Sequence, residues 1–194
     1  MKDLTKRQKQ IIDISINIIS ERGIQVLTMK NLSNELGISE PAIYRHFESK
    51  QKILVAVLDS FKHQNKLIHE NIPLEGESAF NHITRSIEMI MNRFNKNHAM
   101  SAVIFSEEIF QNQNELSEMV SNIMNTTIGF FTNLLQKGQI DGSIRSDIGI
   151  DELSIIVMGS IRHIVTVWRL SGFSSNLCES GNKLIKSLEV IIAA

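Results

Sequence analysis

The chain has little of what disulfide-stabilised, metal-binding or sheet-rich proteins depend on. Its 194 residues include one cysteine, Cys178, and two prolines. A single cysteine excludes an internal disulfide and a cysteine-rich metal site, which suits a reducing cytoplasm. The scarcity of proline and of alternating apolar residues predicts an all-α fold.

The sequence also lacks a long apolar run and an N-terminal signal. No apolar run approaches the roughly 18 residues that a membrane helix needs. The first ten residues, MKDLTKRQKQ, are charged and polar. We therefore expect a cytoplasmic protein with no membrane partner.

Catalytic and metal-binding patterns are missing as well. The six histidines show no metal-ligand spacing, and the sequence has no glycine-rich phosphate loop. Cys178 has no neighbour that suggests a nucleophile. We therefore expect a protein that is not an enzyme and has no cofactor.

The most informative stretch runs from Thr28 to Lys50 and reads TMKNLSNELGISEPAIYRHFESK. Thr28 is a natural helix N-cap, and Gly37 suits the left-handed backbone at a helix C-terminus. The residues between them place one apolar stripe at helical spacing: Met29, Leu32 and Leu36. The stretch therefore begins with a short amphipathic helix that ends in a tight turn.

A second short helix follows the turn. Ser39 is in the N-cap position, and Pro41 falls in the first turn, where no backbone donor is needed. Ile43 and Phe47 are predicted to point inward at i, i+4 spacing. Two short helices joined by a glycine turn indicate a helix-turn-helix.

This order of residues closely resembles the N-terminal domain of the TetR/AcrR family of bacterial transcription regulators. The resemblance implies an N-terminal three-helix bundle with a helix-turn-helix over residues 1–49. A C-terminal helical bundle for ligand binding and dimerisation would cover residues 50–194, with a helix over 50–71 linking the two parts. The implied function is a ligand-responsive repressor that binds a palindromic operator as a dimer, because a dimer on promoter DNA blocks polymerase.

The resemblance also suggests which side chains meet DNA. Four residues able to donate a hydrogen bond or a charge are implied to lie near phosphates: Thr28, Tyr44, His46 and Lys50. Four others are candidates for contacts with base edges: Glu40, Pro41, Ala42 and Arg45. Thr28 is equally explained as a helix cap, and Glu40 as a favourable charge at a helix N-terminus.

The distribution of charge agrees with DNA binding at one end. Residues 1–52 contain nine Lys and Arg against six Asp and Glu, a balance of +3, whereas the whole chain has a charge of −1. The remainder is therefore near −4. This modest asymmetry is expected when only the N-terminal part meets phosphate.

Further helical patterns fill the rest of the chain. We expect helices over 78–95, 97–111 and 114–137, one capped by Asp151, and a last one over 177–192. The last two have too much apolar surface for one-sided burial. The resemblance implies that their second side meets another subunit, giving a homodimer through the last two helices.

Aromatic and methionine side chains of the middle helices suit a cavity for a largely apolar small-molecule effector. For any one of them, simple core packing is the more economical explanation. The candidate ligand contacts are Phe94, His98, Phe105, Thr127, Phe130, Arg162, Thr166 and Trp168. The alternative is a DNA-bound protein-interaction factor of the same fold with no small-molecule effector.

Overall fold

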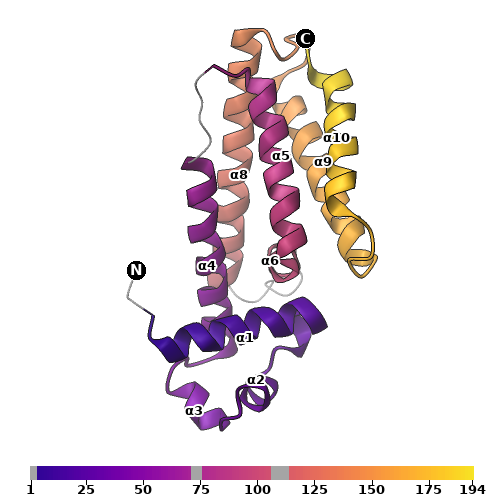
Figure 1. Ribbon diagram of the computed structural model, residues 1–194. Helices are drawn as coiled ribbons and strands as arrows, with labels where there is room; N and C mark the ends of the chain where they lie inside the picture. The colour runs from indigo at the N-terminus through magenta and orange to yellow at the C-terminus, as the bar shows by residue number, and fades with distance from the viewer. Residues whose placement is uncertain (1–3, 71–75, 106–113) are drawn as a thin grey trace. The chain divides into compact units, whose positions relative to one another are not determined.

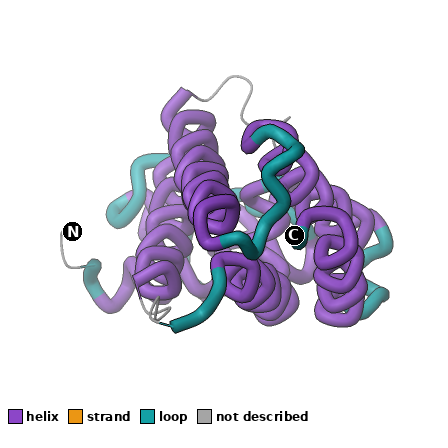
Figure 2. Tube along the Cα trace, turned by 90° about the horizontal axis from the view of Figure 1, so that it is seen from above, coloured by secondary structure: helices purple, strands orange, loops and turns teal. Residues whose placement is uncertain are grey.

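The computed structural model describes residues 4–70, 76–105 and 114–194. Within these ranges the regular structure is helical, and Figure 2 shows no strand there. One isolated antiparallel bridge pairs Ile144 with Ala193. The predicted all-α fold is confirmed.

The chain divides into two compact units. We call them the head unit, Met1–His69 with Asn97–Ser121, and the body unit, Glu70–Lys96 with Asn122–Ala194. Because the long helix from Asn114 crosses from one unit to the other, the two units are interleaved along the sequence. The boundary at residues 49 and 50 remains a prediction.

The head unit contains the helices of the N-terminal motif. They are α1 (Lys6–Arg22), the 3-10 helix η1 (Ile24–Val26), α2 (Met29–Leu36), α3 (Glu40–Tyr44), α4 (Lys50–Glu70) and α6 (His98–Ile104). Figure 1 shows α1 as the long helix beside α2 and α3. The helix predicted over 50–71 is therefore present as α4, and its predicted last residue lies outside the described residues. Its linking role remains a prediction.

Helix α1 supplies most of the head core. It begins at a capping box formed by Thr5 and Gln8, and it ends at Gly23, whose φ of 85° favours glycine. One broad face of α1 is buried: Ile11, Ile12, Ile18 and Ile19. Each such isoleucine contributes about 1.5–3 kcal/mol of burial free energy. This face packs against η1, α2 and α6, so α1 is the scaffold of the head unit.

The body unit is built from long helices. They are α5 (Ala79–Lys96), the larger part of α8 (Asn114–Asp141), α9 (Ile150–Leu170) and α10 (Leu177–Ile192). α10 packs against both α5 and α9 (Figure 1). Its bounds match the predicted helix 177–192 to the residue.

Three of the predicted helix ends are wrong. α8 continues to Asp141 instead of ending at residue 137, and α9 has Gly149 as its N-cap instead of Asp151. α6 ends at Ile104, short of the predicted residue 111, and residues 106–111 lie outside the described residues. Gly138, which follows the predicted end of this helix at residue 137, is thus inside α8.

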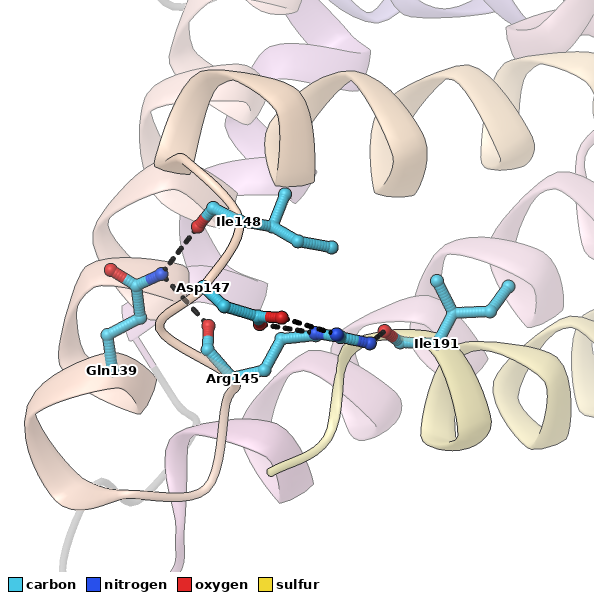
Figure 3. A network of polar contacts seen from close by, with 5 residues as sticks. All are labelled: Gln139, Arg145, Asp147, Ile148 and Ile191. Atoms are coloured by element: carbon cyan, nitrogen blue, oxygen red, sulfur yellow. Dashed lines mark hydrogen bonds and ion pairs between the residues drawn. The ribbon is translucent and has the colours of Figure 1, made fainter.

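A polar network closes one end of the body unit (Figure 3). The Arg145 guanidinium donates two hydrogen bonds of 2.6 Å to the Asp147 carboxylate and one of 3.1 Å to the Ile191 carbonyl. The Gln139 amide donates to the carbonyls of Arg145 and Ile148, each at 3.0 Å. These contacts tie the loop between α8 and α9 to the C-terminal end of α10.

α9 is long and apolar enough to cross a membrane, judged by length and composition alone. The expectation that no such segment exists is therefore corrected. The most apolar window of α9 has a mean hydropathy of 1.4, and 33% of it is buried within this chain. A core helix of a soluble protein has the same property. Because so little of α9 is buried within this chain, we still expect its second side to meet another apolar surface.

Candidate nucleic-acid interface

The turn of the helix-turn-helix is built as its sequence predicts. The Thr28 hydroxyl accepts a hydrogen bond of 3.1 Å from the Asn31 backbone and so caps α2. Gly37 has φ 64° and ψ 33°, the left-handed conformation that ends α2. The Ile38 N–H then donates to the Ser33 carbonyl at 3.1 Å. These bonds fix the direction in which the chain enters α3.

Helix α3 is short and is anchored on one side. Ser39 occupies its N-cap position, but among the described residues the Ser39 side chain makes no capping hydrogen bond, which corrects that part of the prediction. Ile43 is fully buried and Phe47 is 8% exposed, as predicted. With these two side chains directed into the head core, the other face of α3 is presented outward.

None of the eight predicted DNA-contacting residues is buried. Four are exposed: Thr28, Pro41, Tyr44 and Arg45. Four are half-buried: Glu40, Ala42, His46 and Lys50. The Tyr44 side chain is 48% exposed, a placement that head packing does not require. The structure thus brings the candidates on and beside α3 to an accessible face of the head unit.

Lys50, the first residue of α4, has a contact that sequence reasoning missed. Its ammonium donates to the Ile24 carbonyl in η1 at 3.2 Å. Burial lowers the pKa of the Lys50 ammonium from its usual value. An ammonium has three donors, so this bond orients the group and leaves capacity for a phosphate.

A second missed contact comes from α1. The Gln8 amide nitrogen donates to the His46 carbonyl at 3.3 Å. The capping pattern Thr-x-x-Gln is visible in the sequence, but the bond to a residue 38 positions away has no local signal.

The candidate ligand residues fall in both units. Phe94, Thr127, Phe130, Arg162, Thr166 and Trp168 lie in the body unit, whereas His98 and Phe105 lie in the head unit. Phe94 and Trp168 are buried, and the other six are half-buried. The predicted ligand contacts therefore come from two units. That they surround one ligand remains a prediction.

Aromatic packing explains part of this set. The Phe130 and Phe131 rings meet edge to face with centroids 5.5 Å apart, and Trp168 meets Phe173 in the same way at 4.7 Å. The Thr127 hydroxyl donates to the Ile123 carbonyl of its own helix at 2.9 Å. These side chains have structural roles within the body unit.

Partly buried arginines on α9 say more about a possible ligand than the aromatic side chains do. Arg162, Thr166 and Arg169 follow at i, i+4 and i+7, so they share one face, and all three are half-buried. Burial, and then the neighbouring charge of Arg162, lower the pKa of the Arg169 guanidinium. On α5, burial lowers the pKa of Arg93 to about 10. The protonated forms of Arg93 and Arg169 are thus destabilised in the structure.

A cavity of 290 Å³ lies between α5 and α10, away from the predicted ligand contacts. It is lined by Glu88, Met91, Asn92, Cys178, Gly181 and Asn182. None of the eight predicted ligand residues lines it, and the Cys178 thiol donates to the Asn92 side-chain oxygen at 3.3 Å. Within the described residues, no group of three His, Cys, Asp or Glu side chains is placed to hold a metal ion.

A helix-turn-helix whose α3 end exposes Tyr44 and Arg45, in a chain whose described residues are helical, indicates a DNA-binding regulator. Residues 11–57 match the family described as bacterial regulatory proteins, tetR family. Residues 61–192 match the description YsiA-like protein, C-terminal region, within the same family.

The chain belongs to the tetR family of bacterial regulatory proteins. It is a DNA-binding transcriptional regulator of the ligand-responsive repressor type, as the resemblance to that family implied.

Two similar proteins span most of the chain. The fatty acid metabolism regulator protein of Bacillus subtilis (strain 168) is 21% identical over 188 residues, which cover 97% of this chain and 96% of that protein. The HTH-type transcriptional repressor KstR2 of Rhodococcus jostii (strain RHA1) is 23% identical over 168 residues, covering 87% and 82%.

A solved structure shares the fold over nearly the whole length. The transcriptional regulator FadR from Bacillus subtilis, in complex with stearoyl-CoA, superposes with a TM-score of 0.76 at 21% identity. The match covers 94% of this chain and 97% of that one.

Proposed function

We propose that this regulator is a cytoplasmic homodimer that places α3 of each head in successive major grooves of a pseudo-palindromic operator. In such dimers the two recognition helices lie about 34–36 Å apart, one turn of DNA. The observation that carries the proposal is the exposure of Tyr44 and Arg45 beside the buried anchors Ile43 and Phe47. Because buried side chains anchor this short helix, its exposed side chains are held in an orientation suited to contact DNA.

The residues would divide between affinity and sequence recognition. Thr28, Tyr44, His46 and Lys50 would contact phosphates, which gives affinity without sequence preference. Arg45 can fork onto guanine, Glu40 can accept from cytosine, and Ala42 with Pro41 can meet a thymine methyl. For Lys50, the bond to the Ile24 carbonyl supports a phosphate role because it holds the ammonium in place.

Selection of operator DNA tests this proposal. The wild-type protein is mixed with pooled genomic fragments, and bound fragments are recovered at two salt concentrations. We expect enrichment of fragments that share a two-fold symmetric site, with affinity falling steeply as salt rises. Recovery of fragments that share no sequence feature would overturn sequence-specific binding.

The dimer would form through α9 and α10. These helices pack together and carry large apolar side chains on the surface of the single chain: Ile155, Val167, Leu170, Val190 and Ile191. Leu170 is 83% exposed and Val190 is 82% exposed. Exposed apolar side chains on two neighbouring helices are suited to an interface between proteins.

A charge substitution tests the dimer. In Leu170→Glu we expect the dimer to dissociate, because a carboxylate would be buried at the interface. Ile140→Glu is the matched control, since Ile140 is 87% exposed but lies on α8. The molar mass is measured by size-exclusion chromatography with light scattering. If Ile140→Glu dissociates and Leu170→Glu does not, the interface is elsewhere.

The effector would be a largely apolar molecule with an anionic end, such as a long-chain acyl-CoA thioester. Two observations support this class: similarity to a regulator whose structure holds stearoyl-CoA, and the half-buried Arg162 and Arg169 on one face of α9. An anionic end would relieve the mutual repulsion of these two cations. Effector binding would change the spacing of the heads, a coupling that is usually worth about 1–3 kcal/mol.

A panel of acyl-CoA thioesters, fatty acids and free coenzyme A tests the effector class. Fluorescence of Trp168, the single tryptophan and buried in the body unit, reports binding, and loss of operator binding reports the response. We expect long-chain thioesters to act and free coenzyme A to be inert. If no compound shifts Trp168 emission or thermal stability, the alternative of a protein-interaction factor becomes the better explanation.

A further inference from the structure

One side chain in the first turn of α1 has two separate contacts. The Gln8 side-chain oxygen accepts from the Thr5 N–H at 3.0 Å, and the Gln8 N–H donates to the Thr5 hydroxyl at 3.2 Å. This reciprocal pair caps α1 and occupies the oxygen of the Gln8 amide. The amide nitrogen is directed elsewhere.

That nitrogen donates to the His46 carbonyl at 3.3 Å. His46 lies two residues beyond the end of α3, and its own N–H donates to the Ile43 carbonyl at 2.8 Å. Carbonyls at the end of a helix have run out of partners in that helix and need donors from outside it. Gln8 supplies such a donor.

The position of this bond gives it importance for DNA reading. α3 has five residues, too few to hold an orientation by its own hydrogen bonds. Its anchors, Ile43 and Phe47, are apolar, and apolar packing is non-directional. A hydrogen bond is directional, and this one acts immediately after the exposed Tyr44 and Arg45.

We propose that Gln8 is a positioning residue for operator recognition: its bond to the His46 carbonyl sets how α3 presents Tyr44 and Arg45 to DNA. This inference rests on the proposed DNA-reading role of the α3 face. In this proposal Gln8 acts through the His46 carbonyl, because its amide oxygen and nitrogen each bond to a group of the head unit. A cap of α1 alone would leave DNA reading unaffected.

The substitution Gln8→Glu separates the two contacts. A carboxylate still accepts from the Thr5 N–H and is favourable at a helix N-terminus, so the cap is retained. It has no donor for the His46 carbonyl and repels that oxygen. Gln10→Glu is the matched control: it makes the same charge change in the same helix, and its oxygen can still accept from Arg7 as the Gln10 oxygen does.

The readout is the ratio of dissociation constants for scrambled DNA and for the operator selected by the wild type, at two salt concentrations. We expect Gln8→Glu to lower this ratio about tenfold relative to Gln10→Glu, the effect of about one lost hydrogen bond. Thermal unfolding should remain cooperative in both variants. A purely structural role would change the unfolding midpoint but not the ratio.

Gln8→Met, which has neither donor nor acceptor, keeps the test decisive. We expect it to lose the same discrimination as Gln8→Glu and to unfold at a lower temperature, because it also loses the acceptor for the Thr5 N–H in the capping box. Equal ratios for Gln8→Glu and Gln10→Glu would overturn the role of Gln8 while leaving the DNA-reading role intact. If the wild type selects no operator, the proposed function itself fails.

Discussion

Replacing Gly138 with alanine should destabilise the body unit, against the usual preference for alanine in helices. Gly138 lies inside α8, where alanine normally gains about 1 kcal/mol. A Cβ built at Gly138 would lie 2.1 Å from Cγ1 of Ile144 and 3.0 Å from its Cβ. Ile144 is 1% exposed, so its side chain is enclosed by other groups of the protein.

The size of the effect follows from these distances. Displacing Ile144 forfeits much of its burial, about 1.5–3 kcal/mol, and forcing extra volume into a packed core costs about 1–3 kcal/mol. After the helix gain of about 1 kcal/mol, we expect a net loss of about 1.5–5 kcal/mol. For a chain of this length each 1 kcal/mol shifts the unfolding midpoint by about 2–4 °C.

Gly129→Ala is the control in the same helix. A Cβ there would meet nothing within 4 Å, so only the helix gain applies and the midpoint should rise. Midpoints are measured by circular dichroism at one fixed protein concentration, because a dimer's midpoint depends on it. If Gly138→Ala melts at or above the wild type, the close contact with Ile144 does not limit stability.

Two further substitutions probe the body unit. Gly181→Ala, which would place a Cβ 2.7 Å from Cγ of Met91, should lower the unfolding midpoint by several degrees, whereas an unchanged midpoint would show that α5 and α10 can separate slightly. The side-chain hydrogen bond from Ser143, aided by the Ala79 backbone bond, lowers the Asp141 pKa below its usual 3.8, so this stabilisation is present above that pH and lost as pH falls below it. Asp141→Ala should therefore be less stable than the wild type at pH 7, and a stability gap that stays constant down to pH ~2 would contradict this origin. In the head unit, Lys50→Met should lower the unfolding midpoint and also flatten the salt dependence of operator binding by about one unit per head, and an unchanged salt dependence would assign Lys50 a structural role only.

Local sequence signals predicted the elements whose causes are local. α10 was predicted at its observed bounds because Leu177–Ile192 combines a clear start with sustained helical periodicity. The helix-turn-helix followed from Thr28 as a cap and Gly37 as a left-handed terminator. Both features lie within a few residues of the positions they control.

Features that depend on distant partners were missed. Gly138 follows the predicted helix end at residue 137, yet it lies within α8, where its missing side chain makes room for Ile144. The bonds from Gln8 to His46 and from Lys50 to Ile24 join positions 38 and 26 residues apart. No local pattern encodes such pairings, since they arise only when α1, η1 and α3 are packed together.

The most direct test of DNA reading by α3 compares Arg45→Ala with Tyr44→Phe on the selected operator and on operators changed at single base pairs. We expect Arg45→Ala to relax discrimination at one base pair per half-site, a loss of about 1–3 kcal/mol, because the contact is to a base edge. Tyr44→Phe should weaken binding to all operators by a similar factor, because the lost contact is to phosphate. If neither variant changes affinity or discrimination while both remain folded dimers, α3 is not the DNA-reading element.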